Sequence, residues 1–242
     1  MVVWEMNNQN DERSKILGIL NKSRYNNELI DGLEVSGMNL SFSDLTGVIA
    51  NRIFANGANL RASSLIRTSF RDCEFLSANF DSCNFEGADI ADCVLSEATL
   101  RNAQMKDAEI KISTCIETCF DEVELCNGNL SGSTLIKATF RQANLHGISA
   151  SKAYFDESDL RGANLVNGDF EESDFISANL SEVDASYANF TGGNLTGAIL
   201  CNGNFTGANC TNVKLNDVSW KGAIVEGAIF DDAVREEILK MV

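Results

Sequence analysis

The sequence predicts an all-β solenoid: a square parallel β-helix of about ten coils, with a short helix over each end. Three observations predict it. Apolar residues recur at every fifth position from Val35 to Phe230 without interruption, and the residue two places before each is small. The segments outside residues 33–230 carry apolar residues at helical spacing instead. A short, fixed period of this kind is the signature of a repeat architecture.

The five-residue period fixes which side chains face inward. It gives 40 apolar positions, which we call centres, of which 16 are Leu and 12 are Phe. At the position two residues earlier, 36 of 40 residues are Ala, Cys, Gly, Ser, Thr or Val. Neither a helix nor a flat strand keeps every fifth residue on one side. A chain that turns a corner every five residues does, and four such sides close a coil of 20 residues that stacks about 4.8 Å from the next.

The four alanine centres support a shared core. Each has a β-branched residue two positions earlier, so the volume lost at one inward site is restored at its neighbour, as close packing requires. The pairs are Val48 with Ala50, Ile53 with Ala55, Ile148 with Ala150 and Val183 with Ala185.

The repeat resembles that of the pentapeptide repeat family, whose consensus is a small residue, Asp or Asn, Leu or Phe, a polar residue and often Gly. Ala58-Asn59-Leu60-Arg61-Ala62 and Ala188-Asn189-Phe190-Thr191-Gly192 follow it. The resemblance covers about 200 residues and implies a right-handed quadrilateral β-helix, but no single function. The acidic composition resembles that of the quinolone-resistance members that bind DNA gyrase. Those members carry loops that interrupt the coils, and this chain keeps its frame throughout.

We divide the chain into an N-terminal segment, residues 1–32, the β-helix, residues 33–230, and a C-terminal segment, residues 231–242. A helix is predicted over residues 10–23, with Asn10 as its N-cap. Its apolar side is expected to comprise Ile16, Leu17, Ile19 and Leu20. Further upstream, Trp4 and Met6 either fold back onto the first coils or stay loose.

The C-terminal segment predicts a second helix. It begins with two acids, and its apolar residues at helical spacing are Val234, Ile238, Leu239 and Val242. Stacked coils leave two open ends that must be covered, so we expect both helices to be caps. The alternative for the C-terminal helix is dimerisation, as in some members of the family that the repeat resembles.

The candidate chemical groups do not converge. Cys73, Cys83 and Cys93 fall at the small inward position and Cys115 and Cys210 at centres, so all five should be buried small hydrophobes. Cys119, Cys126 and Cys201 should point outward at scattered places, and the single His146 should be a solvated surface residue. A Cys73–Cys93 disulfide is geometrically conceivable, but free thiols are favoured in a reducing compartment. We therefore expect no enzyme, no metal site and no cofactor.

Charge restricts the partners. Lys and Arg total 19 against 35 Asp and Glu, a net charge of −16, so the chain should repel nucleic acid and anionic membranes. No apolar run is long enough for a membrane span and no leader peptide is recognisable, so a cytoplasmic location is expected. Its natural partners are proteins with basic surfaces.

The outer walls differ in charge and in apolar content. We name the four sides by their first centres, the Leu40, Leu45, Ala50 and Ala55 sides. Over residues 36–230 the Leu40 side carries five acids and five bases, whereas the Ala55 side carries seven acids and two bases. The Ala55 side also collects the largest set of outward apolar residues, which we call the apolar stripe: Phe54, Leu76, Val94, Ile116, Ile136, Tyr154 and Ile176. Acids interleave with it at Glu74, Glu97, Glu117, Asp156, Glu157 and Asp174.

The stripe has three interpretations. An apolar strip bordered by one sign of charge is typical of a binding surface, including one for a second copy of the chain. Alternatively, branched residues stack well along a parallel ladder whether or not anything binds. The N-terminal segment could also lie over part of the stripe.

Two functions follow from these features. The first is a protein-interaction scaffold that binds a partner through its outer faces. The alternative, implied by the resemblance to gyrase-binding family members, is a DNA mimic whose carboxylates replace phosphates in the basic groove of DNA gyrase or another topoisomerase. Its candidate acids are Asp169, Glu171, Glu172 and Asp174.

Overall fold

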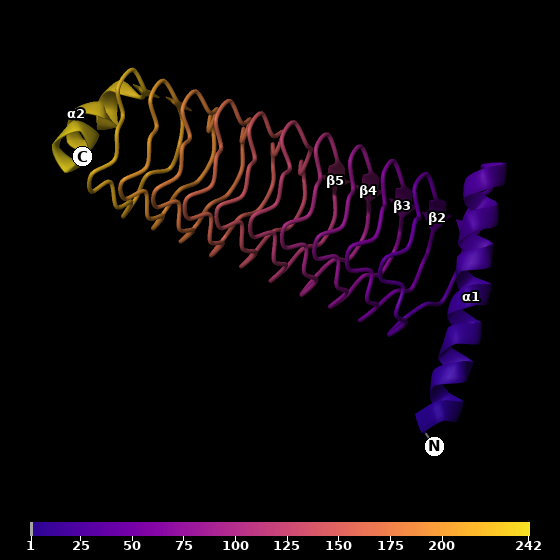
Figure 1. Ribbon diagram of the computed structural model, residues 1–242. Coiled ribbons are helices and arrows are strands. Elements are labelled where there is room, and N and C mark those ends of the chain that lie inside the picture. The colour runs from indigo at the N-terminus through magenta and orange to yellow at the C-terminus, as the bar shows by residue number, and fades with distance from the viewer. Residues whose placement is uncertain (1) are drawn as a thin grey trace.

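The protein is a parallel β-solenoid of about ten turns with one helix at each end (Figure 1). The computed structural model describes residues 2–242, with the side chains of residues 11–236 and 238–242. Helix α1 (Val2–Asn26) lies across the first coil and helix α2 (Asp232–Met241) lies at the last one. The predicted solenoid with helical caps is therefore confirmed.

The strands are short because each side of a coil is only five residues long. Five of them form one parallel sheet on the Ala50 side, in the order β1-β2-β3-β4-β5, and two more, β6 and β7, pair near the C-terminus. The strands are β1 (Ile30–Asp31), β2 (Ile49–Asn51), β3 (Ser69–Arg71), β4 (Asp89–Ala91), β5 (Glu109–Lys111), β6 (Asn209–Cys210) and β7 (Ile229–Phe230).

Every pairing is offset by 20 residues. Ile30 pairs with Ala50 in the sheet, and isolated bridges such as Phe54–Glu74 keep the same offset on the other sides. The ladder thus begins at Ile30, just before the predicted boundary at residue 33. Because each coil pairs with the next in parallel, the backbone is hydrogen-bonded along the rod, and the position of one coil fixes the register of the next.

The corners depend on a left-handed residue. The second residue after each centre from Val35 to Val225 has a positive φ, and 27 of these 39 corner residues are not glycine. At most corners the N–H three residues after the centre donates to the centre's carbonyl, as from Ala58 to Ala55 at 3.0 Å. A positive φ at the third position is the requirement of a type II turn. Backbone geometry therefore imposes the five-residue period, even where the corner residue is as unfavourable as Ile112.

The core follows the predicted frame. Of the 40 centres, 38 are buried, and the exceptions are Leu215 and Val225 near the C-terminal end. The four compensating pairs at the alanine centres are all buried as predicted. Phenylalanines one coil apart stack with nearly parallel rings, such as Phe155 on Phe175 at 4.7 Å, so the coil spacing also sets the aromatic contacts.

One buried column corrects the prediction for the cysteines. Along strands β2 to β5, the corner N–H donates to the side chain stacked one coil further on: from Ile53 to Cys73 Sγ (3.4 Å), and from Cys73 to Cys93 Sγ (3.4 Å). The N–H of Cys93 then donates to Ser113 Oγ at 3.2 Å. Cys73 and Cys93 are buried as predicted, but they act as hydrogen-bond acceptors as well as small hydrophobes. Cys119 is also corrected, since it is buried rather than outward.

Helix α1 closes the N-terminal end. Leu20 is buried against the first coils, and Ile16 and Leu17 pack beside it, whereas Ile19 is exposed and does not join the predicted apolar side. Arg13 Nε donates to the Asn39 carbonyl at 3.0 Å. The helix begins at Val2, so the prediction of Asn10 as N-cap is wrong. No proline lies upstream to stop the helix, and the side chains of Trp4 and Met6 lie outside the described set.

Replacing Phe170 with Ala should destabilise the fold by roughly 3–5 kcal/mol. Phe170 is fully buried and stacks on Phe190 at 5.2 Å. Its neighbour Asp169 is half-buried on the outer wall, so that Asp169→Ala should cost about 1 kcal/mol or less. Chemical denaturation of both variants is the measurement, and equal losses would contradict the inward and outward assignment.

Cys93→Ala should destabilise by about 1–3 kcal/mol, because it leaves the buried N–H of Cys73 without its acceptor. Cys93→Ser restores an acceptor like that of Ser113 in the next coil, so its free energy of unfolding should stay within about 1 kcal/mol of wild type. If the two variants unfold alike, the column stabilises the fold by packing alone.

Candidate interaction surface

The apolar stripe lies on the outside of the rod. Phe54, Leu76, Tyr154 and Ile176 are exposed, between 37% for Phe54 and 46% for Tyr154. Val94, Ile116 and Ile136 are half-buried, since neighbouring coils cover part of each side chain. Phe54 at the N-terminal end of the stripe is exposed, so α1 does not lie over it.

Stacking places the stripe in two columns. Phe54, Val94 and Tyr154 stand one residue before their centres, in a column whose members are joined by bridges one coil apart. Leu76, Ile116, Ile136 and Ile176 stand one residue after their centres. The 20-residue period predicts this alignment, and the pairings and hydrogen bonds along both columns keep the same offset of 20 residues.

The polar members of the second column have a structural role. Asn56 Oδ1 accepts the N–H of Leu76 at 2.9 Å, and Ser96 Oγ accepts that of Ile116 at 3.3 Å. Asp156 Oδ1 accepts the N–H of Ile176 at 3.0 Å. Each polar residue thus caps an N–H of the following coil, and an uncharged side chain does this at two of the three places.

The charge around the stripe is acidic. Glu74, Glu97 and Glu117 are exposed beside it. Of the two bases on this side, Lys137 forms an ion pair with Glu157, with 3.8 Å between nitrogen and oxygen. Burial raises the pKa of Asp156 from its ordinary value, its hydrogen bond from Ile176 opposes that rise, and the carboxylates of Asp174 and Glu157 add to it.

The candidate DNA-mimic acids are distributed over two sides. Asp169, Glu171 and Glu172 lie on the Ala50 side, and Asp174 follows around the corner on the Ala55 side. Glu171 and Glu172 are exposed, but Glu172 pairs with Lys152 at 3.5 Å. Asp169 accepts hydrogen bonds from Ser151 and Asn189.

Helix α2 covers the C-terminal end incompletely. Ile238 is buried and Val234 packs beside it, whereas Leu239 and Val242 are exposed. Asp231 precedes the helix, but its carboxylate accepts the N–H of Asn212 at 3.0 Å instead of capping α2.

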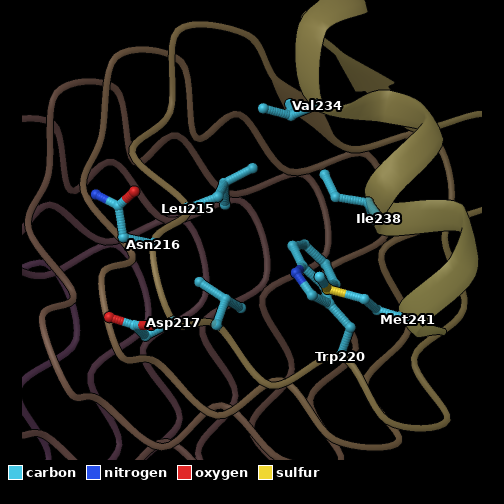
Figure 2. Close-up of a pocket in the computed structure, with 8 residues that line it drawn as sticks. Leu215, Asn216, Asp217, Trp220, Val234, Ile238 and Met241 are labelled. Atoms are coloured by element: carbon cyan, nitrogen blue, oxygen red, sulfur yellow. The ribbon is translucent and has the colours of Figure 1, made fainter.

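A hollow of about 560 Å³ remains between α2 and the last coil (Figure 2). Its apolar lining comprises Leu215, Val218, Trp220, Val234, Ile238 and Met241. Sequence reasoning did not find this hollow. Its only signal was the proximity of the in-phase centres Leu215 and Trp220 to the end of the repeat.

The two cysteines at centres lie deep in the core. Burial raises the pKa of Cys115 and Cys210 to about 12, so that both thiols stay protonated at neutral pH. Among the side chains that the structure describes, no three His, Cys, Asp or Glu residues are grouped to hold a metal ion. Over the same part of the chain, no helix is long and apolar enough to cross a membrane.

The pentapeptide repeats family model matches this sequence in eight copies, over residues 39–75, 78–111, 118–155, 153–192 and 186–219. The chain belongs to the pentapeptide repeat family. No curated protein sequence matches it significantly.

Solved pentapeptide repeat structures resemble this family member in fold. QnrB1, a plasmid-mediated fluoroquinolone resistance protein, aligns with a TM-score of 0.53 at 18% identity, over 88% of this chain and 98% of its own. HetL, involved in heterocyst differentiation regulation in the cyanobacterium Nostoc sp. strain PCC 7120, aligns with a TM-score of 0.46 at 23% identity, over 82% of this chain and 85% of its own. At these identities the likeness concerns the fold alone.

Asp156→Asn should leave the fold slightly more stable at neutral pH, on the order of 0.5 kcal/mol or less for a half-exposed group. The amide oxygen can still accept the Ile176 N–H, and the change removes a carboxylate whose raised pKa shows that ionisation is disfavoured in the folded state. The gain should be fully present above that folded-state pKa and disappear below the ordinary aspartate pKa, where the carboxyl is protonated in both the folded and the unfolded state. Denaturation of both proteins from pH 7 to pH 3 measures it, and a larger gain at low pH would contradict the assignment.

Proposed function

We propose that this pentapeptide repeat protein is a non-enzymatic, acidic, rod-shaped scaffold that binds a protein partner through its outer walls. One observation carries the proposal. The Ala55 side collects seven large outward apolar residues in two adjacent columns, more than any other side of the rod, and four of them are exposed. Aligned exposed apolar residues on one face mark interaction sites more often than scattered ones do.

β-Propensity does not account for the exposed part of the stripe. A stacking preference would apply equally to the other three sides, which follow the same ladder. Over the described rod, each of those sides exposes two large apolar residues. They are Phe42 and Ile199 on the Leu40 side, Tyr187 and Ile224 on the Leu45 side, and Ile112 and Ile229 on the Ala50 side. The apolar stripe exposes four and adds three half-buried ones, whereas the half-buried ones elsewhere are Ile66 and Val166 on the Leu45 side and Ile49 on the Ala50 side.

Substituting both Ile116 and Ile136 with Asp should weaken association by several kcal/mol, because a partner or a second subunit would have to desolvate two new charges. Folding should suffer much less, since acids already occupy this wall at Asp156 and Glu157. Sedimentation measures self-association, and capture from lysate followed by mass spectrometry measures partner binding.

The matched control is Ile199→Asp with Ile224→Asp, which adds the same charge at exposed isoleucines on the Leu40 and Leu45 sides. It should leave association unchanged. If the two double variants associate equally well in both assays, the Ala55 side is not the binding surface of the proposed scaffold.

A DNA mimic is the second candidate function. The observation that favours it is a belt between Arg161 and Lys214 that holds six acids and no Lys or Arg. Glu171 and Glu172 are exposed within it. Such a belt can present carboxylates to the basic groove of gyrase or another topoisomerase, as proposed for the family members that the sequence resembles. The ladder runs without an interrupting loop, so loop-dependent drug protection is not expected.

The mimic should inhibit gyrase supercoiling at low salt and lose inhibition steeply as salt rises, because exposed charges are screened. Neutralising Asp169, Glu171, Glu172 and Asp174 together should weaken inhibition. Neutralising four exposed acids elsewhere, Glu86, Asp92, Asp107 and Glu122, removes the same net charge and should have a smaller effect. Absence of inhibition at micromolar protein would refute this second function.

A further inference from the structure

The Ala55 side offers no backbone to a partner. Along the stripe, the N–H of Val94 donates to the Cys73 carbonyl and that of Tyr154 to the Ser133 carbonyl, while the Tyr154 carbonyl accepts from Leu135. Hydrogen bonds between successive coils therefore already pair these N–H and carbonyl groups. A partner strand therefore finds no free sheet edge along this face and cannot bind by β-augmentation. An α-helix can bind such a face through its side chains, because its own backbone is already hydrogen-bonded internally.

The coil spacing suits a helix that lies along the rod axis. Rings one coil apart stack at 4.7 Å, so two coils span about 9.4 Å. Seven residues of an α-helix rise about 10.5 Å, and three or four residues rise about 4.5–6 Å. Apolar residues at i, i+3 or i+4, and i+7 can therefore meet successive members of the stripe. From Leu76 to Ile176 the stripe covers five coils, about 24 Å, which a helix of about 16 residues spans.

The charges fix the chemistry of that helix. Seven acids against two bases occupy this side, and Lys137 already pairs with Glu157. Asp156 lies within the apolar column itself, between Ile136 and Ile176. Because Asn56 and Ser96 cap the following N–H without a charge in the same column, the hydrogen bond from Ile176 does not require a carboxylate. The charge of Asp156 is therefore free to meet a cation of the partner.

We propose that the Ala55 side docks an amphipathic α-helix of a partner protein, which runs along the rod axis with Lys or Arg residues beside its apolar face. This inference rests on the proposed scaffold function and specifies its partner. Leu76, Ile116, Ile136 and Ile176 receive the apolar face, and Asp156 receives a basic residue near the middle of the helix. Glu97 and Glu117 flank the site.

The test uses an 18-residue fluorescent peptide with Leu at i, i+3, i+7, i+10, i+14 and i+17, which spans about 25 Å as a helix, and with Lys beside these positions. Its affinity for the full-length protein is measured by fluorescence anisotropy at fixed ionic strength, and its helicity by circular dichroism. A peptide of the same composition in scrambled order is the control for non-specific attraction to an acidic protein. We expect the ordered peptide to bind at least about tenfold more tightly and to gain helicity on binding.

The protein variants separate docking from simple charge attraction, because the two make opposite predictions. Ile116→Asp with Ile136→Asp adds negative charge, so non-specific attraction to the basic peptide would increase. Docking on the stripe predicts that this variant binds at least about tenfold more weakly, while Ile199→Asp with Ile224→Asp binds as wild type does. Asp156→Asn should weaken binding about threefold or more. Unchanged or tighter binding by the Ile116 and Ile136 double variant overturns the proposal, provided that thermal unfolding shows each variant folded.

Failure of the inference can be told apart from failure of the scaffold function. If association of the protein depends on Ile116 and Ile136 but the ordered peptide binds no better than the scrambled one, the face is functional and its occupant is not a basic amphipathic helix. If the peptide docks as expected but the association of the protein does not depend on Ile116 and Ile136, the surface can bind a helix and the proposed scaffold function is wrong.

Discussion

The hydrogen-bonded stacking of coils at a fixed offset of 20 residues is the constraint on which the rest of the structure depends. It exists because a turn with a left-handed third residue recurs every five residues, and four such turns bring the chain back over itself. Once the backbone of one coil pairs with the next, the inward side chains stack in columns, as Phe155 does on Phe175. The outward side chains stack in the same way, so that the surface is ordered as strictly as the core.

This constraint explains why outward positions accept many residue types, whereas inward positions accept only residues of a suitable volume. An outward residue contacts only its neighbours in the column, so Asn56, Ser96 and Asp156 can all cap the following coil. An inward residue must fill a fixed volume, which is why an alanine centre such as Ala150 is paired with Ile148. Where the corner hydrogen bond is lost beside strands β2 to β5, the inward side chain itself supplies the acceptor, as Cys93 and Ser113 do.

The period made most of the fold predictable. It identified the 38 buried centres and aligned the apolar stripe, because both follow from counting in steps of five and 20. It did not predict the hydrogen bonds of Cys73 and Cys93. A cysteine at the small inward position fits the sequence pattern equally well whether or not a neighbouring N–H needs an acceptor. The start of α1 at Val2 and the hollow beside Trp220 were also missed, because both lie where the repeat ends and no periodicity constrains the packing.

The 20-residue offset has a consequence for how such a chain can change in length. Duplication or loss of one whole coil would lengthen or shorten the rod and keep every column continuous. Loss of a single five-residue repeat would preserve the buried core equally well, yet it would rotate everything downstream by a quarter turn about the rod axis. A stripe that begins at Phe54 would then continue on a different wall, and a partner that spans several coils would meet only part of it. Binding would therefore select against changes of length that folding alone would allow.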